Sequence, residues 1–192
     1  KEVLSDCNLL TKVNCPLEDE ISILKNETIL IGMLNPSKNQ TKIKEIIKKK
    51  INAFSLELLP RISRAQSMDV LSSQSNLAGY RSVVDSIYEF EKAIPMMMTA
   101  AGTVPAAKVL VIGAGVAGLQ AIATAKRLGA IVSATDVRPA SKEQVESLGG
   151  KFLTVEQTEN LETEGGYAKE ASEDFKRKQA EMMKDALKKN DI

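Results

Sequence analysis

Three glycines and an aspartate in the second half of the sequence have the types and the spacing that hold a dinucleotide. Gly113, Gly115 and Gly118 follow the apolar run 108–112 in a Gly-x-Gly-x-x-Gly pattern, and Asp136 comes 21 positions after Gly115. In such a pattern the first glycine permits a tight turn, the second lets the backbone approach a pyrophosphate, and the third lets the next helix lie close to the strand. The pattern alone is a weak signal, but the preceding strand, the following helix and the acidic residue make it a specific one.

The residues after this pattern indicate which dinucleotide would be bound. A helix that begins near Val116 would direct its free N–H groups and the positive end of its dipole at the phosphates. Asp136 would accept hydrogen bonds from both hydroxyls of the adenosine ribose, which favours NAD because the 2′-phosphate of NADP would face a carboxylate. Arg138 weakens this preference, since NADP sites use a nearby arginine. We therefore predict that NAD(H) is bound by Gly113, Gly115, Val116, Gly118, Asp136, Val137 and Arg138.

Several of these features also have a purely structural interpretation. The glycines would suit a tight strand-to-helix turn in an α/β protein that binds no nucleotide, and Asp136 would suit the N-cap of the next helix. The run Met96-Met97-Met98 is interpreted as packing residues rather than as a soft cofactor pocket.

Short apolar strands and amphipathic helices alternate along the chain. Toward the N-terminus the patterns predict strands over 9–13, 28–34 and 53–59 and helices over 19–24 and 42–50. After a polar, turn-rich stretch over 61–75 they predict strands over 108–112, 130–135 and 152–155, helices over 76–94, 119–128, 142–148 and 167–189, and a further strand beginning at 190–192. This alternation is typical of an α/β fold with parallel sheets. We predict two Rossmann-like domains, both truncated: a partial N-terminal domain over 1–72, and a linking helix with a partial NAD(H)-binding domain over 73–192.

Composition and charge exclude several classes of function. The 192 residues carry 26 Lys and Arg against 25 Asp and Glu, and a net charge of +1 gives no electrostatic footprint for nucleic acid. The chain has no histidine, which excludes an imidazole base and a histidine-ligated metal site from it, and we predict no metal. Cys7 and Cys15 match no metal-binding spacing and are expected to be reduced thiols. No apolar run approaches the ~18–20 residues of a membrane span, and the absence of an initiator Met indicates a trimmed chain.

Three long runs of the sequence closely resemble one family. They are MMMTAAGTVPAAKVLVIGAGVAGLQAIATAKRLGAIVSATDVRPASKEQVESLGGKF (96–152), LELLPRISRAQSMDVLSSQSNLAGYRSVVD (56–85) and GGYAKE (165–170). These runs are similar to the NAD(H)-binding component of the proton-translocating transhydrogenases, in the alanine dehydrogenase/transhydrogenase family. The resemblance covers nearly the whole chain and is far more specific than the glycine pattern.

The resemblance implies a second group of site residues, in a loop that lines the nicotinamide end of NAD(H) and faces the NADP(H)-binding component. The residues that it assigns to this loop and to hydride transfer are Arg61, Gln66, Asp69 and Ser72. Spacing alone would identify them only as a polar surface loop. The resemblance also assigns Gly166 and Tyr167 to a mobile loop that closes over bound nucleotide. Ala171 departs from the family, which usually has Met at this position.

The same resemblance implies direct hydride transfer between NAD(H) and NADP(H), with NADP(H) bound on a partner subunit. Such a step needs two rings held face to face and shielded from water, without proton transfer on this chain, so the absence of histidine is compatible with it. Membrane-spanning and NADP(H)-binding partners would couple the transfer to proton movement. We expect a homodimer that is attached peripherally to the cytoplasmic or matrix face of an energy-coupling membrane.

Two other functions are compatible with parts of the sequence. An alanine dehydrogenase would share the two-domain architecture, but its histidine is expected near Asn35 and the chain contains none. A non-catalytic or degenerate NAD-binding fragment is the other alternative, because the family's NAD(H)-binding component is longer than this chain. A separately encoded chain would then supply the C-terminal complement.

Overall fold

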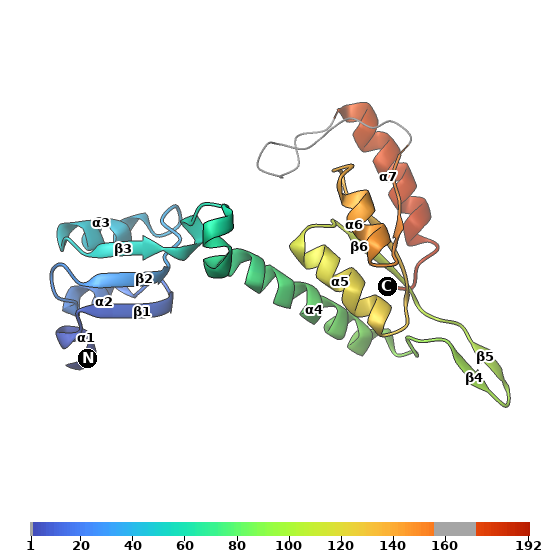
Figure 1. Cartoon of the computed structure of the whole chain (residues 1–192), viewed down its shortest axis with the longest axis horizontal. Coiled ribbons are helices and arrows are strands. Elements are labelled where there is room, and N and C mark those ends of the chain that lie inside the picture. Colours follow the sequence, from blue (N-terminus) through green and yellow to red (C-terminus); the bar gives the residue numbers. More distant parts are fainter. Residues whose placement is uncertain (1, 156–171) are drawn as a thin grey trace. The chain divides into compact units, whose positions relative to one another are not determined.

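The chain forms two compact units, Lys1–Ser73 (unit 1) and Gln74–Ile192 (unit 2), in a computed structural model that describes residues 2–155 and 172–192 (Figure 1). Each unit has its own parallel sheet and its own hydrophobic core. The predicted fold class, α/β with two Rossmann-like parallel sheets, is confirmed. Among the helices that the structure describes, none combines the length and the apolar content of a membrane-spanning segment.

Unit 1 contains a three-stranded parallel sheet in the order β1-β2-β3. The strands are β1 (Leu9–Asn14), β2 (Ile29–Met33) and β3 (Asn52–Ser55), and the helices are α1 (Glu2–Asp6), α2 (Glu18–Ile23) and α3 (Gln40–Lys48). Successive side chains of a strand point to opposite faces of the sheet. Leu30 of β2 is fully buried in a core with Ile21 and Ile46 of the helices, whereas Leu9 and Phe54 on the other face are more than half exposed. The helices therefore cover one face of this sheet.

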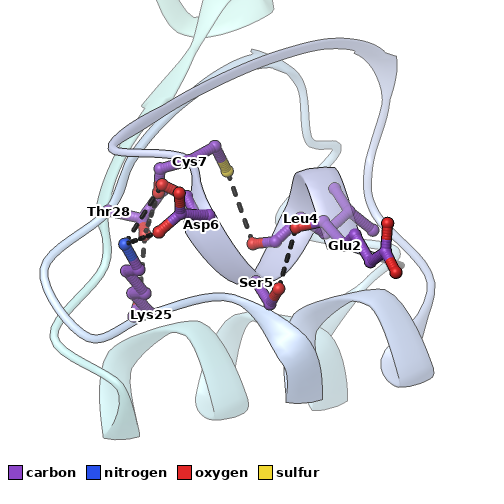
Figure 2. Close-up of polar contacts among 7 residues, drawn as sticks. All are labelled: Glu2, Leu4, Ser5, Asp6, Cys7, Lys25 and Thr28. Atoms are coloured by element: carbon purple, nitrogen blue, oxygen red, sulfur yellow. Dashed lines mark hydrogen bonds and ion pairs between the residues drawn. The ribbon is translucent and has the colours of Figure 1, made fainter.

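Polar contacts join the residues that precede β1 and β2 (Figure 2). Lys25 Nζ donates to the Asp6 carboxylate at 2.6 Å. The Thr28 hydroxyl donates to the carbonyl of Lys25 at 2.9 Å and to that of Cys7 at 3.4 Å. Both cysteines of the chain are free thiols, as the sequence predicts. These contacts stabilise the amino edge of the sheet, whereas α/β sheets bind ligands at the carboxyl edge.

The chain leaves the sheet of unit 1 earlier than the sequence pattern predicts. β3 ends at Ser55, and Leu56–Leu58 form a 3₁₀ turn, η1. The Glu57 carboxylate accepts hydrogen bonds from the Ser55 hydroxyl, at 2.8 Å, and from the Asn35 N–H that follows β2. The predicted strand over 53–59 is therefore wrong in its last four residues, because polar contacts turn the chain back toward the end of β2.

Much of the stretch 61–75, predicted to be turn-rich, is helical. The 3₁₀ helix η2 (Ser63–Met68) leads into α4 (Val70–Phe90), which begins at Val70 rather than at residue 76. α4 ends at Phe90, ahead of the Pro95 that was expected to stop it, where Glu91 adopts a left-handed conformation with φ 55°. Both boundaries are set by local backbone and capping geometry rather than by the apolar pattern.

A hairpin that the sequence pattern did not predict follows α4. β4 (Met97–Thr99) pairs with β5 (Gly102–Val104) in antiparallel fashion, and the hairpin extends away from the rest of unit 2 (Figure 1). Every residue of these two strands is exposed, and Met96 and Met98 are 62% and 83% exposed. The interpretation of Met96, Met97 and Met98 as packing residues is therefore wrong within the described chain.

Unit 2 contains a second parallel sheet, and its first strand leads into the glycine loop. The elements are β6 (Lys108–Ile112), α5 (Val116–Arg127), β7 (Ile131–Thr135), α6 (Ser141–Ser147), β8 (Lys151–Phe152) and α7 (Glu173–Leu187). The sheet order is β6-β7-β8, and the core contains Val109, Ile122, Ala134 and Val145. β6 has the predicted limits, and the other elements lie within a few residues of theirs, apart from the part of the predicted helix 167–189 outside the described residues.

A further chain segment pairs with the free edge of β6. The Ile192 N–H donates to the Lys108 carbonyl at 3.1 Å, and the Leu110 N–H donates to the Ile192 carbonyl at 2.7 Å. This alternation is the bonding of a parallel strand, so the prediction of a strand beginning at 190–192 is supported by the hydrogen bonds. With this segment the order of strands in the sheet is the Rossmann order 3-2-1-4, in which the fourth strand lies on the opposite side of the first strand from the second.

Candidate dinucleotide site

The loop between β6 and α5 turns sharply at the carboxyl end of β6. Gly113 has φ 93°, in the left-handed region that favours glycine. Its N–H donates to the Thr135 carbonyl at 2.8 Å, which extends the pairing of β6 and β7 into the loop. The loop therefore lies at the switch point of the sheet, where open α/β sheets bind ligands.

Gly118 allows close backbone packing, whereas Gly115 has only the end of one described side chain within 4 Å of a built Cβ. A Cβ on Gly118 would lie 1.8 Å from the Gly113 carbonyl oxygen, so the first turn of α5 packs directly on the loop. The nearest described atom to a Cβ on Gly115 would be Arg138 Nη2, at 3.9 Å. Gly115 is the N-cap of α5, and the first N–H groups of a helix have no acceptor within that helix. The loop can therefore present backbone N–H groups to a phosphate.

Asp136 follows β7, and its carboxylate accepts four hydrogen bonds. Oδ1 accepts from the N–H of Arg138 at 2.8 Å and from its Nε at 2.9 Å. Oδ2 accepts from the Ala114 N–H at 2.7 Å and from Arg138 Nη2 at 2.9 Å. The Asp136 side chain is 7% exposed and that of Arg138 is 21% exposed. The carboxylate therefore ties the end of β7 to the glycine loop as well as to the guanidinium.

These contacts determine the charge of the Asp136 carboxylate. Burial alone would raise its pKa, but the hydrogen bonds from the Arg138 side chain and from the N–H groups of Arg138 and Ala114, with the positive charge of Arg138, hold the pKa below its ordinary value. Asp136 is thus ionised at neutral pH, and Arg138 neutralises much of its charge.

The interpretation of Asp136 as a helix N-cap is wrong. α6 begins at Ser141 and its N-cap residue is Ala140, whereas the Asp136 carboxylate bonds to Ala114 and Arg138. Of the remaining predicted residues, Val116 opens α5 and is 41% exposed, and Val137 is half-buried. The structure thus brings the glycine loop, Asp136 and Arg138 together at one edge of the unit 2 sheet.

The second predicted group lies in unit 1, where η2 leads into α4. The Asp69 carboxylate caps α4, accepting from the Ser72 N–H at 2.9 Å and from the Ser72 hydroxyl at 2.7 Å. These two bonds, with the positive charge of Arg61, hold the pKa of Asp69 below its ordinary value. Arg61 and Gln66 are exposed. Two of the four residues therefore have a structural role in starting the helix, and two present their side chains to solvent.

Gly166 and Tyr167, and with them Ala171, lie outside the described residues. Asn35, expected near the histidine of an alanine dehydrogenase, follows β2 with φ 45°, and its N–H donates to Glu57. The sequence pattern missed the Ala114 N–H as a partner of Asp136, because a backbone group leaves no signal in the identity of its side chain.

Comparison with known proteins identifies both halves of the chain. Residues 1–78 match the family model "Alanine dehydrogenase/PNT, N-terminal domain" and residues 82–192 match "Alanine dehydrogenase/PNT, C-terminal domain". The chain is 58% identical over its whole length to an NAD(P) transhydrogenase alpha subunit of Rhodospirillum rubrum, of which it covers 52%. It is 29% identical to an alanine dehydrogenase of Staphylococcus epidermidis over 78% of the chain and 41% of that protein.

A solved structure has a similar fold. The crystal structure of a transhydrogenase from Sinorhizobium meliloti matches with a TM-score of 0.85 at 50% sequence identity, over 98% of this chain and 50% of that one. The chain spans about half the length of the transhydrogenase subunit and of the solved chain that it matches.

Proposed function

Because the chain belongs to the alanine dehydrogenase/PNT family, we propose that it is the NAD(H)-binding part of a proton-translocating NAD(P) transhydrogenase. The observation that carries this proposal is the 58% identity to a transhydrogenase alpha subunit over the entire chain. The reaction would be direct hydride transfer between NAD(H) here and NADP(H) on a partner subunit, and the nicotinamide of NAD(H), when bound, supplies the carbon that gives or takes the hydride.

The residues of the unit 2 site fit a dinucleotide. Two features support the binding of a pyrophosphate: among the described residues only the end of the Arg138 side chain lies within 4 Å of a Cβ built on Gly115, and the N–H groups of the first turn of α5 follow it. We propose that the Asp136 carboxylate accepts hydrogen bonds from ribose hydroxyls once Arg138 gives up its two side-chain bonds. On this proposal Gly166 and Tyr167 close over the bound nucleotide and exclude water.

The segment that begins α4 would serve the nicotinamide end. We propose that Arg61 and Gln66 orient the ring and its carboxamide, and that the cap formed by Asp69 and Ser72 fixes the backbone that follows them at the start of α4. Hydride transfer between two rings depends on their apposition, and a shift of about an ångström in such a residue slows it by about a hundredfold.

The partners follow from the same proposal. Membrane-spanning and NADP(H)-binding subunits would couple hydride transfer to proton movement, and the chain would lie on the cytoplasmic or matrix face of the membrane. It would form a homodimer, and a sedimentation experiment that finds only monomers would remove this part of the proposal. A continuation or a separately encoded chain corresponding to the other half of the relatives would complete the NAD(H)-binding component.

Alanine dehydrogenase activity is the second candidate, favoured by the match to the protein of Staphylococcus epidermidis. It would need an acid–base residue near the carboxyl end of β2, where this chain has Asn35 with its N–H bound to Glu57. Pyruvate, ammonia and NADH test it directly, and we expect no turnover. Oxidation of NADH that depends on both pyruvate and ammonia would favour the dehydrogenase instead.

Reconstitution tests the proposed function. The chain is combined with a polypeptide corresponding to the other half of its relatives and with the membrane and NADP(H)-binding subunits of a transhydrogenase. Hydride transfer from NADPH to an NAD analogue of shifted absorbance should depend on adding the chain. Transfer that never depends on it would favour the alternative of a non-catalytic fragment.

A further inference from the structure

A glycine outside the dinucleotide pattern packs against the helix that the pattern begins. Gly79 lies in the part of α4 that belongs to unit 2, and α4 runs beside α5 there (Figure 1). Gly79 is buried, and a Cβ built on it would lie 2.0 Å from the carbonyl oxygen of Ala117 and 2.8 Å from its carbonyl carbon. Carbon and oxygen atoms that are not bonded to each other rarely come closer than about 3.3 Å, so only glycine permits this approach.

The atoms that Gly79 meets belong to the first turn of α5. On another side of that turn a Cβ on Gly118 would lie 1.8 Å from the Gly113 carbonyl oxygen. Both contacts are made to backbone atoms, so rotation of a side chain cannot relieve either of them. The first turn of α5 is therefore held between the glycine loop and α4.

A glycine inside a helix lowers stability, so the close packing at Gly79 must compensate for it. Glycine in a helix interior is less favourable than alanine by about 1 kcal/mol. At Gly79 the close contact between α4 and α5 offsets that cost. A methyl group here would have to move α4 and the first turn of α5 apart by about an ångström, because neither backbone can yield locally.

We infer that Gly79 is a positioning residue of the dinucleotide site, a fourth glycine that holds the first turn of α5 where its N–H groups meet the pyrophosphate. This inference rests on the proposed function. It acts chiefly on the phosphate end of the ligand, because Asp136, which would bind the adenosine ribose, follows β7 and is not part of α5. Replacement of Gly79 should consequently lower the affinity for ligands that carry phosphate and leave the affinity for ligands without phosphate unchanged.

The test compares the affinities of ADP and adenosine for the full chain and its Gly79→Ala variant by titration calorimetry. ADP affinity should fall by about tenfold or more, equivalent to about 1.4 kcal/mol, while adenosine affinity stays within about twofold. The thermal midpoint should fall, although the same change at a spacious helical site would raise it. Val83→Ala is the matched control, because it removes packing from the same helix at a residue that is 7% exposed, and it should leave the ratio of the two affinities unchanged.

A second measurement on the unchanged protein does not depend on whether the variant folds. ADP should slow amide hydrogen exchange over 76–83 of α4 as well as over 113–119, and adenosine should not. Protection confined to 113–119, or equal losses of ADP and adenosine affinity in Gly79→Ala, would overturn the inference while leaving the proposed function intact. Failure of the unchanged chain and of its reconstituted complex to bind ADP and NADH would overturn both.

Discussion

Arg138 occupies one acceptor position on each oxygen of the Asp136 carboxylate through its Nε and Nη2 atoms, and backbone N–H groups occupy the other two. A carboxylate has about four such positions, so this one is full. The bond from the Ala114 N–H cannot be released without moving the glycine loop, and the bond from the Arg138 N–H cannot be released without moving the backbone after β7. The two guanidinium bonds, by contrast, are released by rotation of one side chain. Two ribose hydroxyls need two positions, and we expect them to replace these two bonds.

The charge of Arg138 should limit how strongly the site rejects a 2′-phosphate. Arg138→Met leaves the Asp136 carboxylate without its counter-charge, so the ratio of NADH to NADPH affinity should rise by about tenfold. Fluorescence titration with each nucleotide measures it. Arg127→Met removes an equal charge from the last turn of α5 and should not change the ratio. A ratio that falls in Arg138→Met would mean that Arg138 does not compensate Asp136.

The pH dependence of stability should contain a contribution from Asp136. Its pKa is lowered in the folded protein, so its stabilising contribution is fully present above the unfolded value of about 4 and is lost as the pH falls toward the folded value. Asp136→Asn removes this titration and should flatten the decline in the free energy of unfolding below about pH 4. Urea unfolding between pH 3 and pH 7 measures it; a variant with the same decline as the unchanged protein would contradict the assignment.

The sequence could predict those features of the unit 2 site that require a particular residue type. Gly113 and Gly118 are required by a left-handed turn and by a close approach, so their spacing after an apolar run predicts the loop. The saturation of Asp136 could not be predicted, because two of its four partners are backbone N–H groups that any residue would supply. A sequence pattern indicates where an acidic residue lies but not which bonds it already makes.

The boundaries that were missed have local causes. Asp69 is of a type that favours the N-cap, which would start a helix at Val70, but Ser72 stands where a capping box has Glu or Gln, so the signal is incomplete. The hairpin of β4 and β5 turns through Ala100-Ala101 and a Gly102 with φ 128°, without the Asn-Gly or Asp-Gly pair that marks most tight hairpins. Apolar periodicity carries information on neither feature.

The cap of α4 should be measurable apart from any role in hydride transfer. Ser72→Ala removes the hydroxyl bond to Asp69 but keeps the N–H bond, so it should lower the thermal midpoint less than Asp69→Ala, which removes both. Ser73→Ala changes an exposed hydroxyl that bonds to Val70 and should have the smallest effect. Differential scanning calorimetry orders the three, and equal midpoints for Asp69→Ala and Ser73→Ala would contradict the cap.

Gln66 should affect the rate of transfer more than the binding of nucleotide. Its side chain is exposed, so Gln66→Asn should change stability by less than about 0.5 kcal/mol. In the reconstituted complex we expect the rate of hydride transfer to fall by about tenfold or more, because the ring is misplaced, while NADH affinity changes by about threefold or less. Gln74→Asn makes the same change on the exposed side of α4 and serves as the control. An unchanged rate in Gln66→Asn would remove this residue from the site.

The affinity of the chain for NADH, measured by calorimetry with and without the polypeptide corresponding to the other half of its relatives, tests the central claim most directly. We predict saturable binding of NADH that is tighter than that of NADPH and that weakens by about a hundredfold in Asp136→Ala, through the loss of two hydrogen bonds to a charged group at about 1.5 kcal/mol each. Absence of NADH binding in both preparations, or equal binding by the unchanged protein and Asp136→Ala, would contradict it.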